Sequence, residues 1–231
     1  MQSEQFDVLH EPFTDCYYFG KDRQSNRYGD AAEKREISGA SVCRQILAPG
    51  SKKRFVKELC FQADSYISDE FIRRVTSAFI VRSPDAVFSS LIKLKPDFTE
   101  HEFGYTALEK IWGKVSALQD EPPLLIDGDD FRADPSRSLT AFCAMAGIAY
   151  DAKMLSWSDG RIRPWGSDEA ESQAKWHKTL ELSSGIIPPF PREEVPVPEE
   201  RQELMLNAWR VYRDIMSNRA RVSRQPTGSR W

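Results

Sequence analysis

The sequence is poor in the residues that build disulfide frameworks, metal sites and membrane spans. Its four cysteines, Cys16, Cys43, Cys60 and Cys143, are widely scattered and contain no Cys-x-x-Cys pair. This spacing supports neither a disulfide framework nor a zinc site, so reduced thiols and no metal are expected. No apolar run approaches the ~18 residues of a membrane span. The polar start, residues 1–5, resembles no signal peptide. We therefore expect a cytoplasmic protein with no membrane partner.

The chain also lacks a charge excess and a glycine-rich phosphate loop. It has 32 basic and 35 acidic residues, a net charge of −3, so nucleic acid is not an expected partner. No GxxxxGK[ST] pattern occurs anywhere. The 40% of hydrophobic residues is ordinary for a globular protein and sufficient for a core. The 231 residues predict one domain spanning 1–231, with a loose tail from about 223.

Short apolar runs and helical patterns alternate along the chain and predict an α/β fold. Apolar residues recur with helical spacing over 84–94, 105–119 and 135–146, and again in a final helix after Pro198. Strands separated by helices favour a mostly parallel sheet flanked by helices. The four runs predicted as buried strands are 6–9, 55–59, 78–81 and 124–126.

Polar residues follow or end each predicted strand. In open parallel sheets, ligands bind outside the carboxyl ends of the strands, so these groups are expected to share one edge. A simpler interpretation stays open, namely that strand ends are polar because they meet solvent. The polar groups are His10 and Glu11, Lys57 and Glu58, Arg82 and Ser83, and Asp127 with the residues up to Asp130.

The third strand carries the most specific signal, because it turns directly into a helix. Ser83 is a good N-cap and Pro84 a good first helical residue. The backbone N–H groups at such a helix start favour an anion, and the guanidinium of Arg82 suits phosphate. Ser90 meets the same anion only if the ligand lies along the helix. The alternatives are an ion pair of Arg82 with an acidic neighbour and a packing role for Ser90.

These residues resemble the sulfotransferases that use 3′-phosphoadenosine 5′-phosphosulfate (PAPS). The Arg82-x-Pro84 pair with Ser90 eight positions after the arginine is similar to the family's 3′-phosphate motif. The apolar strand and acidic block at 124–131 also resemble the family. The His-Glu-Pro-Phe stretch at 10–13 is similar to its divergent microbial branch. The likeness covers residues 6–190 and implies a P-loop-NTPase-like sulfotransferase architecture with PAPS as cofactor.

The resemblance is incomplete at the phosphate loops. The family begins with a strand, a loop that grips the 5′-phosphosulfate, and a helix, whereas this chain starts at what would be the next strand. A longer native protein, a wrong gene start or loss of the loop would each explain this, and loss would leave sheet edges to be covered. A later basic loop is matched loosely by Lys178, Ser184 and Gly185. The alternative there is a surface helix end with Trp176 packed inward.

The resemblance also leaves the catalytic base open. The family's histidine would fall at Leu59 or Cys60, where this chain has none. Glu58 could act as base if burial raised its pKa, and His10 is the other candidate. Lys57 would offset charge on the transferring sulfonate. His10 at a strand end could instead be structural.

The acceptor is expected to be a small hydroxylated or amine compound, and aromatic residues suggest that it is apolar. Core packing would supply aromatics equally well, and the oligomeric state stays open. The residues predicted to bind the acceptor are Glu11, Phe13, Tyr17, Tyr18 and Trp176.

Three other functions compete with sulfonate transfer. The scaffold could catalyse a PAPS-independent acid/base step with His10, Glu11, Lys57, Glu58 and Asp127. A nucleotide hydrolase or kinase would use Asp127 to bind magnesium. A non-catalytic relative would have a collapsed pocket at the strand ends.

Overall fold

A computed structural model describes residues 6–29, 36–158, 178–191 and 194–222. Its four strands are β1 (Phe6–His10), β2 (Lys53–Lys57), β3 (Ala78–Val81) and β4 (Leu124–Asp127). All four lie where apolar runs predicted them, although β2 ends at Lys57 and not at Leu59. Within the described ranges, no helix combines the length and hydropathy needed to cross a membrane.

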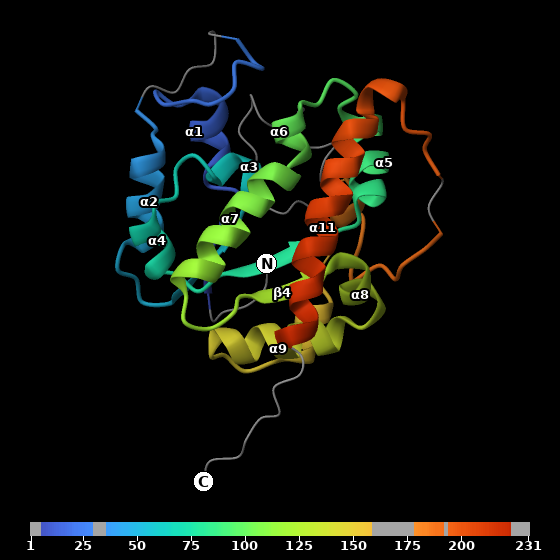
Figure 1. Cartoon of the computed structure of the whole chain (residues 1–231). Helices are drawn as coiled ribbons and strands as arrows, with labels where there is room; N and C mark the ends of the chain where they lie inside the picture. The colour runs from blue at the N-terminus through green and yellow to red at the C-terminus, as the bar shows by residue number, and fades with distance from the viewer. Residues whose placement is uncertain (1–5, 30–35, 159–177, 192–193, 223–231) are drawn as a thin grey trace.

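Helices occupy most of the remaining described chain (Figure 1). The three central helices begin where their patterns predicted, and the last helix follows a single 3-10 turn after Pro198. The helices are α1 (Thr14–Phe19), α2 (Gly39–Leu47), α3 (Cys60–Ala63), α4 (Asp69–Arg73), α5 (Pro84–Leu94), α6 (Glu100–Phe103), α7 (Tyr105–Leu118), α8 (Gly128–Ala133), α9 (Pro135–Ala146) and α11 (Gln202–Val222), with 3-10 turns η1 (Ala152–Leu155) and η2 (Glu199–Arg201).

The strands are parallel, and in the described chain they form two separate pairs. β1 pairs with β2 in the register His10↔Lys57, and β3 pairs with β4 in the register Val81↔Asp127. The α/β class with parallel strands flanked by helices is confirmed. The single sheet expected from the sequence is replaced by two two-stranded sheets.

Helix α9 contacts both strand pairs. It packs against β4, and its Phe142 ring meets Phe55 of β2 edge-on at 5.7 Å. The Nζ atom of Lys53, also in β2, donates to the carbonyls of Ala146 and Gly147 at 2.7 and 2.9 Å. A cation at the carboxyl end of a helix is favourable, so this contact stabilises the helix as well as the junction. Helix α9 therefore joins two sheets that share no described strand pairing.

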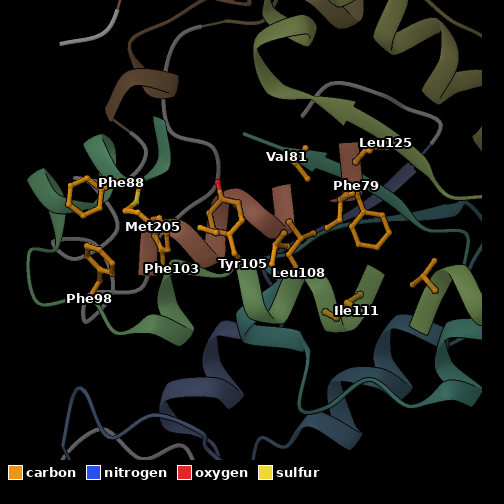
Figure 2. Packing of buried hydrophobic residues seen from close by; sticks show 14 of the residues in the cluster. Phe79, Val81, Phe88, Phe98, Phe103, Tyr105, Leu108, Ile111, Leu125 and Met205 are labelled. Atoms are coloured by element: carbon orange, nitrogen blue, oxygen red, sulfur yellow. The ribbon is translucent and has the colours of Figure 1, made fainter. Parts of the chain in front are cut away.

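The larger hydrophobic core lies between β3, β4 and the helices α5, α7 and α11. Helices α7 and α11 lie side by side across these strands (Figure 1). Figure 2 shows Phe88, Phe98 and Phe103 gathered at one end of this cluster and Phe79 at the other. A smaller cluster around Phe13 joins α1, α2 and α3 beside the other strand pair.

Two polar contacts fasten α11 to the turns that follow β3 and β4. Trp209 donates through Nε1 to Asp85 at 3.1 Å, and the Tyr212 hydroxyl donates to Asp127 at 2.7 Å. The other oxygen of Asp127 accepts the N–H groups of Asp129 and Asp130 and so caps α8. Helix α11 thereby holds the strand ends in place.

We expect Ile215→Ala in α11 to lower the free energy of unfolding by about 2–5 kcal/mol, because it empties a packed position. Ile215 is 3% exposed, whereas Leu206 in the same helix is 72% exposed. Leu206→Ala should change stability by less than about 0.5 kcal/mol and is the matched control. Urea denaturation checks both values. Equal effects of the two substitutions would contradict this packing of α11.

Candidate functional site

A cavity of about 560 Å³ opens at the carboxyl ends of β1, β2 and β3. Its polar wall includes His10 and Glu11 after β1, Lys57 at the end of β2 and Arg82 after β3. These side chains come from segments up to 72 residues apart, yet they face one space. The volume is within the range of roughly 300–1,000 Å³ found for small-molecule sites. The fourth strand end differs, because Asp127 caps α8 and does not line the cavity.

Arg82 and Ser90 line this cavity together. Ser83 is the N-cap and Pro84 the first residue of α5, as predicted from the sequence. Ser90 lies two turns further along, on the side of α5 that faces the same space as Arg82. Both side chains are exposed to the cavity opening. A ligand lying along α5 could therefore contact both.

Two residues that sequence reasoning did not assign hold Arg82 in place. The Tyr105 hydroxyl donates to the Arg82 carbonyl at 2.7 Å. Gly128, at the start of α8, leaves room for the arginine stem, since a Cβ atom there would lie 2.9 Å from Arg82 Cγ. The backbone and the side chain of Arg82 are thus positioned by different neighbours. No local sequence pattern points to contacts over such separations.

Lys57 and Glu11 form an ion pair within the cavity wall. The Glu11 N–H also donates to the Lys57 carbonyl at 2.7 Å, which extends the β1–β2 pairing by one residue. Glu11 has a φ of 48° and is the one non-glycine residue with positive φ in the described chain. This conformation is costly for a residue with a side chain and is common near functional sites. It turns the chain sharply just after His10.

Glu58 lies behind the cavity wall and does not line it. One carboxylate oxygen accepts the Phe13 N–H at 2.8 Å, and the other accepts the Leu59 N–H at 2.7 Å. Burial raises the pKa of Glu58 to about 7, against the lowering effect of these two hydrogen bonds. The carboxyl group therefore fastens the turn after Glu11 to the end of β2.

The residues predicted to bind the acceptor divide into two groups. Tyr18 lines the cavity. Phe13 is buried and stacks on Tyr66 at 5.7 Å, and Tyr17 is buried with its ring edge-on to Phe61 at 5.4 Å. Both belong to the packing around α1. Trp176 lies outside the described residues.

The predicted basic loop contacts the segment that follows η1. The Ser184 carbonyl accepts the Trp157 N–H at 3.0 Å, and Gly185 forms an antiparallel bridge with Ser156. Lys178 is exposed. None of these three loop residues lines the described cavity, whereas Leu180 between them does.

Many cavity residues were not predicted from the sequence, and Tyr28, Lys95 and Glu102 are among them. Lys95 follows α5 directly and continues the spacing of Val87 and Leu91, which also line the cavity. Projecting the helical period one residue beyond the helix would have placed Lys95 on the same face. Tyr28 and Glu102 carry no such signal.

The sequence matches a family model described as a sulfotransferase domain over residues 2–220, nearly the whole chain. The chain belongs to this sulfotransferase family. The fold described above, with parallel strands flanked by helices, agrees with the α/β architecture of sulfotransferases. No solved structure matches the chain.

Two curated relatives of this sulfotransferase-domain chain come from Arabidopsis thaliana. It is 27% identical over 196 residues to branched-chain-amino-acid aminotransferase-like protein 2, covering 81% of this chain and 33% of that protein. It is 27% identical over 173 residues to branched-chain-amino-acid aminotransferase-like protein 1, covering 71% and 29%. The chain thus spans about a third of the length of these relatives.

The raised pKa of Glu58 predicts a specific pH dependence of stability. The folded state binds the proton more tightly than the unfolded state, whose glutamate pKa is ~4.3. The stabilisation is complete below that pH and is lost as the pH rises to about 7. The full loss, reached above that pH, amounts to about 4 kcal/mol, at about 1.4 kcal/mol per pKa unit.

Glu58→Gln should flatten this dependence, because glutamine does not titrate. Urea denaturation at a series of pH values from roughly 4 to 8 measures the slope. The exposed Glu70→Gln is the matched control and should keep the wild-type profile. An unchanged slope in Glu58→Gln would show that another group is responsible.

Proposed function

We propose that this sulfotransferase-family chain binds PAPS and transfers its sulfonate to a hydroxyl or amine group of a small acceptor. The observation that carries the proposal is the shared cavity. Arg82 and Ser90, which match the family's 3′-phosphate motif, line it together with His10 and Lys57. Nucleotide-binding and acid/base groups therefore border one space of small-molecule size.

The nucleotide end of the cavity suits a phosphate group. The Arg82 guanidinium offers a planar fork of donors, which matches phosphate oxygens better than an ammonium does. The start of α5 adds backbone N–H groups and the positive end of an eleven-residue helix. The Ser90 hydroxyl supplies a further donor along the same wall. These groups fit the 3′-phosphate of the nucleotide.

When bound, PAPS would supply an activated sulfonate, and its bond from sulfur to phosphate oxygen would break as the acceptor oxygen or nitrogen bonds to sulfur. His10, which lines the cavity, would take the proton that the acceptor hydroxyl releases. Lys57 offsets the negative charge on the sulfonate oxygens, and its ion pair with Glu11 fixes where the ammonium sits. Glu58 acts through the backbone, by holding the turn that carries Glu11 against β2.

The geometry favours this proposal over two of the alternatives. A non-catalytic relative was expected to have a collapsed pocket, whereas the cavity at the strand ends is open. A magnesium-dependent hydrolase would need Asp127 as a metal ligand, but both of its oxygens accept protein hydrogen bonds. In the described ranges, no group of three metal-binding side chains occurs.

Calorimetric titration with 3′,5′-adenosine bisphosphate, the product nucleotide, tests the nucleotide site. Arg82→Ala should weaken binding about tenfold or more, since a charge-assisted hydrogen bond contributes about 1.5–3 kcal/mol. Ser90→Ala should have a smaller effect in the same direction. Arg73→Ala, an exposed arginine of α4 outside the cavity wall, is the control. No binding to folded wild-type protein would reject PAPS and leave PAPS-independent acid/base chemistry or a binding role.

A second measurement separates the proton acceptor from the nucleotide site. His10→Asn should lower the rate of sulfonate transfer by about 10²-fold or more while leaving bisphosphate affinity unchanged. His101→Asn is the control, because His101 contacts the Phe61 carbonyl at 2.9 Å and does not line the cavity. A His10→Asn enzyme with the wild-type transfer rate would exclude His10 as the base.

A further inference from the structure

The cavity follows one side of α5 from a cation at one end to a cation at the other. Arg82 lies just before the helix, Val87, Ser90 and Leu91 line the cavity along it, and Lys95 lies just after it. Eleven residues at about 1.5 Å each give the helix a length of roughly 16 Å. The nucleotide motif, Arg82 and Ser90, does not include the last residues of α5 or Lys95 beyond them. The Lys95 end needs a separate explanation.

Lys95 is held at its end of the cavity by a carboxylate and an aromatic ring. Its ammonium forms an ion pair with Glu102 and lies 5.8 Å from the centre of the Tyr18 ring. Tyr28 meets Tyr18 edge-on at 5.1 Å. All four residues line the cavity, so the ammonium sits in a wall made largely of aromatic rings.

Glu102 does not need Lys95 to balance its charge. Arg27 donates to both of its oxygens, through Nε at 2.9 Å and Nη2 at 2.7 Å. The Thr99 N–H adds a bond at 2.9 Å, within a capping box at the start of α6. Although burial alone would raise it, the donors from Arg27 and Lys95 lower the pKa of Glu102 to about 2. The carboxylate is therefore ionised and already paired before Lys95 is counted.

Arg27, Lys95, Glu102 and Asp97 form one cluster of ion pairs. The part of this cluster that is shielded from solvent carries an excess positive charge. Arg27 and Lys95 contribute two positive charges and Glu102 one negative charge, which leaves one positive charge unbalanced. Asp97 also pairs with Arg27, but its side chain is 71% exposed and its charge is screened by solvent. Burial lowers the pKa of Lys95, which shows the cost of keeping this ammonium away from water. An anion in the cavity would offset that cost.

The ammonium also has donors to spare in the described chain. An ammonium has three N–H donors, and the hydrogen bond described for Lys95 goes to Glu102. The cavity wall also carries apolar side chains, among them Ile80, Leu91 and Leu108. A ligand that fits these surfaces has an apolar body and an accepting group that meets the Lys95 ammonium.

We propose that the Lys95 end of the cavity binds a carboxylate of the acceptor, so that the acceptor is a hydroxylated carboxylic acid with an apolar body. This rests on the proposed sulfonate transfer for the position of the acceptor hydroxyl. The hydroxyl lies at His10 and Lys57, the apolar body lies against Leu91 and Leu108, and the carboxylate lies at Lys95. Tyr18 and Tyr28 shield the ion pair from water and strengthen it.

Direct titration of the nucleotide-free protein tests the carboxylate site without any transfer chemistry. The probes are para-hydroxybenzoate, para-hydroxyphenylacetate and para-hydroxyphenylpropionate, each compared with its methyl ester. We expect wild-type protein to bind at least one acid about tenfold or more tightly than its ester. Lys95→Met should abolish this preference and leave ester affinity unchanged. Lys95→Arg should retain it, because the positive charge remains.

Two controls keep the result interpretable. Lys114→Met removes a surface lysine that pairs with Asp69 and should leave the preference for the acid intact. The product nucleotide should bind equally well to wild-type protein and to Lys95→Met. If the nucleotide does not bind to wild-type protein, the proposed nucleotide site is rejected, but the carboxylate site is not. Equal binding of acid and ester, binding of neither by folded wild-type protein, or a preference that survives in Lys95→Met would overturn the carboxylate site.

Discussion

The packing of α9 against both strand pairs is the constraint on which the cavity depends. β1 and β2 carry His10, Glu11 and Lys57, whereas β3 leads to Arg82. In the described chain, no ladder of backbone hydrogen bonds joins the two pairs. The contacts of Phe55 with Phe142, and of Lys53 with the end of α9, join the two pairs instead.

Buried carboxylates hold together the segments that form the walls of the site. Glu58 holds the turn after β1 by accepting two backbone N–H groups. Glu102 holds the start of α6 and, through Arg27, the segment that follows α1. Asp127 does the same between α8 and α11. In each case, the acidic group satisfies donors that would otherwise be buried unpaired. Of these three carboxylates only Glu102 also lines the cavity, where Glu11, His10 and the cations Lys57, Arg82 and Lys95 line it as well.

Local patterns predicted the features that short stretches of sequence determine. The turn from β3 into α5 followed from Ser83 and Pro84, and the position of Ser90 along the same helix face followed from the helical period. The strands and their parallel direction followed from short apolar runs separated by helices. These features depend on steric and hydrogen-bonding preferences within a few residues.

Features that depend on distant pairs could not be predicted in this way. Arg27 meets Glu102 across 75 residues, and Phe13 meets Glu58 across 45. Whether an aromatic residue packs in the core or faces a ligand is not encoded in its type, so Tyr18 lines the cavity while Tyr17 is buried in packing. The split into two strand pairs likewise reflects tertiary packing and not strand propensity.

The strands that border the cavity differ in how they resist association with other chains. β2 has the sequence KRFVK, and its three cations discourage edge-to-edge pairing, whereas β3 has the sequence AFIV and no charge. Ile80 in β3 is 64% exposed and also lines the cavity. A ligand that fills the cavity would cover Ile80. It would then remove from solvent an exposed apolar side chain of the strand that carries no charge of its own.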